Sequence, residues 1–118
     1  MRLDFPNSNE LLANVKTENL YGKLVQQIKK DFGLANIPID LADTVSSEDL
    51  RIFLHEKIYY LIMEKFVEYL NLLYVIDVPE KAFREIQVTD AVEVAEQVSF
   101  LVLKREFQKV WLKKKYSS

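Results

Sequence analysis

The sequence has no cysteine and only two glycines and three prolines among its 118 residues. The absence of cysteine excludes disulfide bonds, thiolate catalysis and zinc sites built on cysteine. Glycine and proline interrupt chains into short strands and turns, so their scarcity favours a few long helices. Phosphate-binding loops need closely spaced glycines, and Gly22 and Gly33 are isolated. The sequence therefore indicates an all-α protein without the common nucleotide-binding motifs.

Histidine is almost absent as well, because His55 is the only one in the chain. Zinc sites need several histidine or cysteine ligands, which this sequence cannot supply. A di-iron helical bundle needs Glu-x-x-His motifs, and no glutamate precedes His55 at that spacing. No nucleophile-elbow sequence is present either. We therefore expect no metal ion, no cofactor and no catalytic residues.

The length of the chain is typical of one domain, so we expect residues 1–118 to share one core. The most apolar stretch, Ile58 to Ile76, carries charged and amide side chains near its middle that are costly in hydrocarbon. The first residues lack the apolar core of a signal peptide. These features predict a cytoplasmic protein without a membrane span.

Apolar residues at helical spacing predict a compact bundle of three main helices at about 18–32, 47–76 and 90–114. One or two short helices are expected in addition, over 7–16 and 80–86. Side chains typical of helix N-caps precede three of these segments, namely Asn7, Ser46 and Asp90. Gly33 is a natural C-terminal stop, and residues 34–46 are expected to form a connecting loop.

Two of the main helices have more apolar surface than one neighbouring helix could cover. The apolar arc of the 47–76 helix spans roughly 200°, about twice that of an ordinary surface helix. In the 90–114 helix, the apolar stripe changes to the opposite side, roughly 170° away, near Phe100 and Leu103. Two packing partners would explain this change of face. A buried strand over residues 98–103 is the alternative, because a short apolar run does not separate strand from helix.

This excess apolar surface favours a non-enzymatic protein-interaction module that forms a homodimer or binds another protein. A twofold dimer would bury the same surface on both subunits. The residues that we predict for this interface are Tyr59, Met63, Tyr74, Phe100, Leu103, Phe107, Val110 and Trp111.

Two other functions rest on smaller signals. Arg51 and His55 are four residues apart and share a helix face, so with Tyr59 they could line the pocket of a small enzyme or ligand-binding domain. A partly buried histidine bonded to a neighbour is the simpler interpretation.

The charge distribution provides the third possibility. Residues 104–118 hold six Lys and Arg against one acidic residue, whereas residues 1–103 hold ten against seventeen. This basic C-terminal end could contact nucleic acid. A solvated helix end is the favoured interpretation, because the helix dipole favours cations there, and contact with a protein partner is a further alternative. With a whole-chain pI of about 5.5, nucleic acid is the weakest of the three hypotheses.

Overall fold

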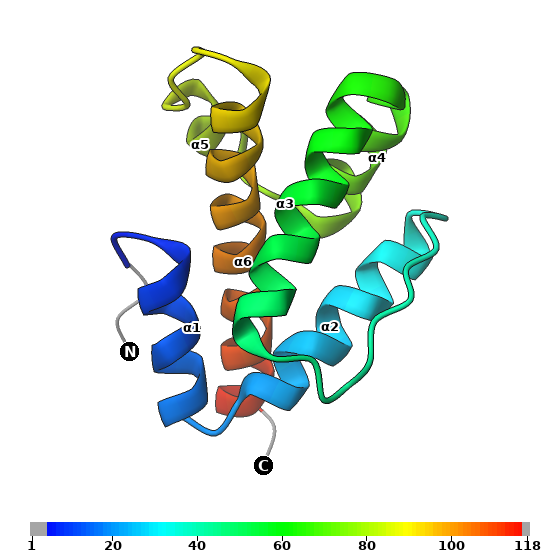
Figure 1. Cartoon of the computed structure of the whole chain (residues 1–118). Coiled ribbons are helices and arrows are strands. Elements are labelled where there is room, and N and C mark those ends of the chain that lie inside the picture. The colour runs from blue at the N-terminus through cyan, green and yellow to red at the C-terminus, as the bar shows by residue number, and fades with distance from the viewer. Residues whose placement is uncertain (1–4, 117–118) are drawn as a thin grey trace.

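The computed structural model describes residues 5–116, which form six α-helices and no strand (Figure 1). The helices are α1 (Ser8–Thr17), α2 (Tyr21–Leu34), α3 (Ser47–Glu64), α4 (Phe66–Ile76), α5 (Glu80–Arg84) and α6 (Ala91–Tyr116). They form a compact globule with a radius of gyration of 13.6 Å. Within this part of the chain, every helix is too short or too polar to span a bilayer.

Three helices begin where their capping side chains predict. The Asn7 Oδ1 atom accepts a hydrogen bond from the Glu10 backbone N–H at 2.9 Å. Ser46 and Asp90 make the same bond to the N–H groups of Asp49 and Glu93, at 3.1 and 2.9 Å. Each bond pairs one of the N–H groups that a helix start leaves without a partner. The expected break between the first two helices is also present, and Asn19 adopts a positive φ of 59° there.

The long helix α6 is the central element of the fold and packs against α1, α2, α3 and α4 (Figure 1). Its 26 residues extend about 39 Å at 1.5 Å per residue, close to the 40 Å longest dimension of the molecule. The first and second halves of α6 therefore meet different helices. Residues 98–103 are helical, so the strand alternative is wrong.

The prediction of a single helix over residues 47–76 is wrong, because the helix is interrupted at Lys65 and divides into α3 and α4. Lys65 has φ −140° and ψ 59°, which is not a helical conformation. Beyond it α4 folds back and packs against α3 (Figure 1). The Asn71 side-chain amide then donates to the Ala35 carbonyl at 3.2 Å, which ties α4 to the end of α2. Part of the wide apolar arc is thus buried within the chain, including Ile58, Tyr69 and Leu73.

The end of α2 also differs from the prediction that Gly33 stops the helix. Gly33 lies inside α2, which continues to Leu34. The left-handed residue that ends such a helix is Asn36, with φ 59°. Asparagine tolerates this conformation better than most residues other than glycine. Asp77, which follows α4, also adopts the left-handed conformation, with φ 66°.

Candidate functional site

Three of the residues predicted for a dimer interface are buried inside the protein. Leu103 and Phe107 have no exposed surface, and Val110 is 3% exposed. The ring of Phe107 lies 6.4 Å from the ring of Phe5, between centroids. These residues are part of the hydrophobic core. Their assignment to an interface is therefore wrong, because the other helices around α6 already cover the second apolar face.

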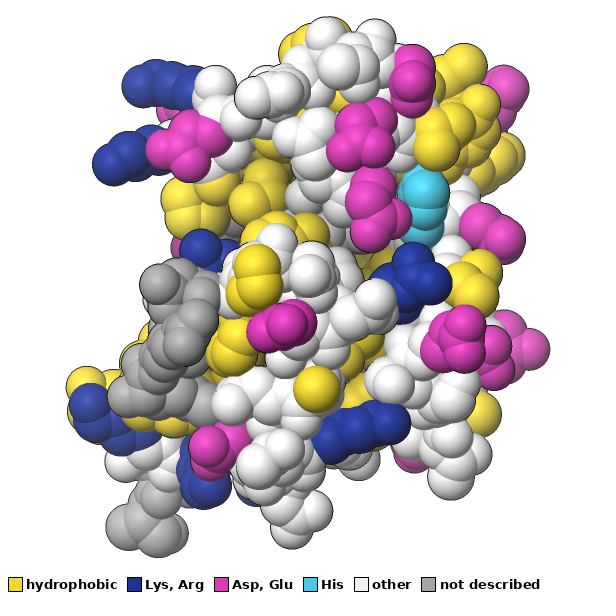
Figure 2. Space-filling view, turned by 60° about the vertical axis from the view of Figure 1, so that its left-hand side comes forward, with side chains coloured by type: hydrophobic (Ala, Val, Ile, Leu, Met, Phe, Trp, Pro, Cys, Tyr) yellow, Lys and Arg dark blue, Asp and Glu magenta, His cyan; other side chains and the backbone are white. Residues whose placement is uncertain are grey.

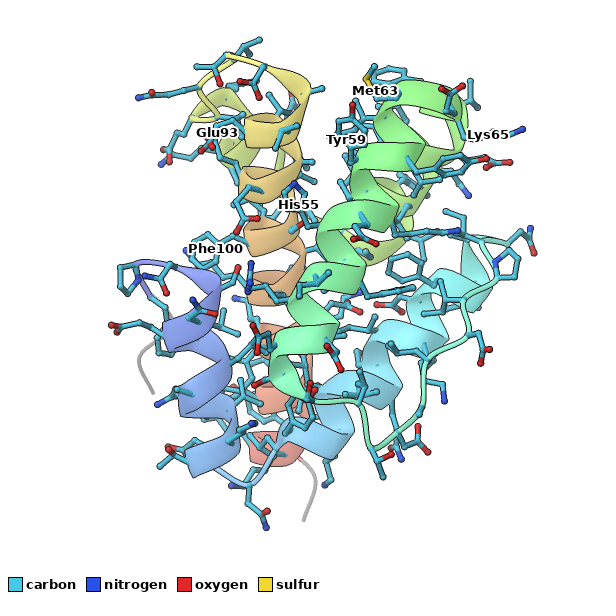
Figure 3. The ribbon with its side chains drawn as sticks, in the orientation of Figure 1. His55, Tyr59, Met63, Lys65, Glu93 and Phe100 are labelled. Atoms are coloured by element: carbon cyan, nitrogen blue, oxygen red, sulfur yellow. The ribbon has the colours of Figure 1, made fainter. Side chains whose placement is uncertain are left out.

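Two further interface candidates, Phe100 and Trp111, are half-buried and pack against the core. Figure 3 places Phe100 on the side of α6 that is turned away from α3. The Lys115 ammonium lies 5.0 Å from the ring centre of Trp111 and covers part of that ring. Trp111 lines a hollow with residues of α1, whereas Figure 3 shows Tyr59 and Met63 on the side of α3 nearer α6. The eight predicted residues therefore do not form one patch.

The most exposed apolar surface lies on α4. We define the α4 stripe as Phe66, Val67, Leu70 and Tyr74, which follow one another along one face of this helix. Their exposed fractions are 53%, 80%, 50% and 84%. Met63, 53% exposed in the last turn of α3, lies three residues before the stripe. Of this group the sequence prediction named only Met63 and Tyr74.

A shallow hollow of about 330 Å³ lies beside the α4 stripe, between α4 and α5. Its lining is mostly apolar and includes two stripe residues, Leu70 and Tyr74. Phe83, on α5, and Val78 form part of the other side. The hollow thus continues the apolar surface of the stripe toward α5. Concave apolar surfaces next to exposed aromatic side chains are typical of contact sites for proteins.

His55 joins α3 to the beginning of α6. Its Nε2 atom is 3.2 Å from the Val92 carbonyl oxygen, and its Nδ1 atom is 3.1 Å from a carboxylate oxygen of Glu96. In Figure 2 the single histidine lies at the surface beside acidic side chains, with hydrophobic side chains next to it. Both ring nitrogens of His55 therefore contact acceptors of the same chain, and these contacts link α3 to the first turns of α6.

Arg51 and Tyr59 do lie with His55 around one hollow, as the sequence prediction of a pocket required. The hollow has a volume of about 340 Å³ and is completed by Ile52, Glu56 and Val92. The Nε atom of Arg51 is buried and has no hydrogen-bond partner among residues 5–116. Such an unpaired donor is uncommon in proteins. Arg51, His55 and Tyr59 therefore line one hollow, in which the ring nitrogens of His55 contact Val92 and Glu96.

Two buried carboxyl groups, which the sequence analysis did not predict, lie between α2 and α6. Glu106 is fully buried and Asp31 is 3% exposed. The Lys109 ammonium is 2.8 Å from an Asp31 oxygen and 3.5 Å from a Glu106 oxygen. The Gln27 amide also donates to Asp31, at 3.2 Å. One partly exposed lysine thus contacts two buried carboxyl groups.

The shared lysine does not compensate both carboxyl groups equally. Burial raises the pKa of Glu106 from its ordinary value of 4.5 to about 9. The nearby Asp31 carboxylate adds to this rise. The pKa of Asp31 is lowered: burial opposes ionisation, but hydrogen bonds from Glu106, Lys109 and Gln27 outweigh it. At neutral pH, Asp31 is ionised and Glu106 keeps its proton.

Comparison with protein-family models, curated proteins and solved structures found no match to this chain. Within residues 5–116, no three His, Asp or Glu side chains lie close enough together to hold a metal ion. The proposal of a function therefore rests on the surfaces of the protein itself, above all on the α4 stripe.

Proposed function

We propose that the protein is an interaction module that forms a homodimer through the α4 stripe together with Met63. The observation that carries this proposal is the exposure of four apolar side chains on one face of an eleven-residue helix. Each would lose contact with water in a dimer, which is the main favourable contribution to most protein association.

The area of this surface supports self-association. A fully exposed aromatic side chain offers about 150–250 Å². With exposed fractions from 50% to 84%, the stripe and Met63 present on the order of 700 Å² of accessible side chain. The largest apolar patch of an ordinary monomer is about 300–600 Å². A standard interface buries about 800 Å² on each partner.

The charges around the stripe favour a second copy of this chain as the partner. Glu64 and Lys65 directly precede the stripe in the chain and are exposed, so the charges at its beginning carry both signs. A partner of one strong charge sign would gain little from these charges, whereas a copy related by a twofold axis can place acids opposite bases. Antiparallel packing of α4 on itself would also align the two helix dipoles favourably.

The test is the solution mass of the purified protein over a concentration series, measured by light scattering after size exclusion. The wild-type protein is expected to approach twice its monomer mass of 13.9 kDa as concentration rises. The double variant Val67→Ser, Tyr74→Ser removes the two most exposed stripe side chains. We expect it to weaken dimerisation by at least about a hundredfold, which corresponds to roughly 2.7 kcal/mol.

A matched control is Val88→Ser, because Val88 is 87% exposed and lies outside the helices, in the loop that precedes α6. This variant loses the same kind of surface and should dimerise like the wild type. A wild-type protein that stays monomeric at about millimolar concentration contradicts the proposal. Equal weakening by Val88→Ser would assign the association to non-specific apolar contacts instead.

A further inference from the structure

A second hollow, of about 330 Å³, lies between α2 and the C-terminal part of α6. Its lining comes from two helix faces that meet at this point. The residues are Lys23, Gln26, Gln27 and Lys30 of α2 with Val110, Lys113 and Lys114 of α6. On α2 they follow the spacing i, i+3, i+4 and i+7, and on α6 the spacing i, i+3 and i+4, so each set occupies one side of its helix.

The hollow gathers four ammonium groups and contains no carboxylate in its lining. Among residues 5–116, no acidic side chain forms an ion pair with Lys23, Lys30 or Lys114. Elsewhere on the same helix, Lys29 does pair with a carboxylate, Asp43, at 3.0 Å. Cations held around one concave surface raise the local positive potential and attract anions.

The hollow is built on ordered groups. Its base is Val110, which is 3% exposed. The Lys113 ammonium donates to the Gln27 side-chain oxygen at 2.6 Å, and the Gln27 amide donates to Asp31 at 3.2 Å. These two bonds fix the position of one cation before any ligand binds, which lowers the entropy cost of binding.

The buried acids behind this hollow do not cancel its charge. The Asp31 carboxylate is neutralised by Lys109 at 2.8 Å. Because burial raises the pKa of Glu106 to about 9, that group is uncharged at neutral pH. The cations of the lining therefore face solvent without a compensating negative charge from the network beneath them.

We propose that this lysine-lined hollow binds a compact polyphosphate anion. Phosphate oxygens accept hydrogen bonds from lysine ammonium groups, which act as point charges without a required plane. A long nucleic acid strand fits less well, because residues 1–103 hold seventeen acidic against ten basic residues and would repel its flanks. The lining also has no aromatic side chain on which a base could stack.

The experiment is calorimetric titration of the full chain with inorganic tripolyphosphate at low ionic strength. The test variant is Lys23→Gln, Lys30→Gln, Lys114→Gln, which leaves the Lys113–Gln27 bond in place. The control variant is Lys16→Gln, Lys57→Gln, Lys81→Gln, which removes the same charge from α1, α3 and α5. Circular dichroism verifies that both variants remain helical, and Lys114→Gln alone replaces the triple variant if that one does not fold.

The dissociation constant is expected to rise at least about tenfold in the test variant and less than about threefold in the control. For Lys114→Gln alone, a rise of about threefold is expected. No binding to the wild-type protein at about millimolar tripolyphosphate would overturn the proposal. Equal weakening in both triple variants would do the same, since it would reveal only a general charge effect. Tighter binding of a single-stranded oligonucleotide than of tripolyphosphate would show that a polymer, and not a compact anion, is the ligand.

Discussion

Replacing Glu106 by glutamine retains the shape of a fully buried side chain and removes its ability to ionise. The pKa of Glu106 is about 9 in the folded chain and near its ordinary value of 4.5 in the unfolded chain. The folded state therefore binds the proton more tightly. The resulting stabilisation is complete below about pH 4.5 and is lost as pH rises toward 9.

The size of the effect follows from the pH chosen. A pH of 7.5 is three units above the ordinary pKa of 4.5, so the unfolded wild-type chain releases this proton. At 1.36 kcal/mol per unit, the release stabilises the unfolded state by about 4 kcal/mol. Glutamine has no proton to release in either state, and its amide can still donate toward Asp31. We therefore expect Glu106→Gln to raise the free energy of unfolding by about 2–4 kcal/mol at pH 7.5, and by less than about 1 kcal/mol at pH 5.

The assay is urea denaturation followed by far-ultraviolet circular dichroism at intervals between pH 5 and 9. Asp31 does not disturb this window, because its lowered pKa confines its contribution to acid conditions. Glu93→Gln, an exposed substitution near the start of α6, controls for the loss of one acidic group from that helix. Parallel stability curves for wild type and Glu106→Gln across the whole window would refute the reasoning.

Two further predictions concern the core and a helix cap. Phe107→Ala removes a fully buried ring and is expected to lower the free energy of unfolding by about 3–5 kcal/mol. Phe66→Ala, on the α4 stripe, should lower it by less than about 1 kcal/mol in the monomer. Urea denaturation at low protein concentration compares the two variants, and similar losses of stability would mean that the core assignment of Phe107 is wrong. Ser46→Ala removes the hydrogen bond from the Asp49 N–H and should lower the free energy of unfolding by about 1 kcal/mol. Ser46→Asp is the control variant that retains a cap. An unchanged melting temperature of Ser46→Ala would count against the cap.

The sequence predicted the helix starts well because capping is a local interaction. Asn7, Ser46 and Asp90 each bond to an N–H group three residues ahead, so the pattern and the bond lie in the same short segment. Helix ends were harder to predict. Asn36 and not Gly33 adopts the left-handed conformation after α2. Either residue can adopt it, and nearby tertiary contacts decide between them.

The break at Lys65 could not be predicted from local sequence, because no glycine or proline lies near it. The wide apolar arc of residues 47–76 was the available sign. Interpreted as one helix, the arc demanded an external partner. With the chain broken into two helices, only part of it is covered within the chain, namely Ile58, Tyr69 and Leu73. The exposed part includes Tyr59 and Met63 on α3 and the α4 stripe, and only the folded geometry separates these residues from the buried ones.

Arg51, His55 and Tyr59 were expected on one helix face because i, i+4 and i+8 positions share it, and all three line one hollow. The partners of His55 were not, since Val92 and Glu96 come from a helix about forty residues away. Glu106 was missed for a similar reason. It stands among lysines and arginines in the sequence, which resembles a solvated helix end, and only the packing of α2 on α6 buries it.

The central position of α6 has a consequence for synthesis of the protein. Four helices pack against α6, yet it is the last of the six to leave the ribosome. Until its 26 residues emerge, which takes a few seconds at about 5–20 residues per second, the apolar faces of α1 to α4 lack their main partner. Protection of the nascent chain during that interval would then depend on chaperones and on the weaker contacts among the earlier helices. Substitutions in α6 should for this reason reduce the yield of protein in cells more than their effect on purified protein suggests.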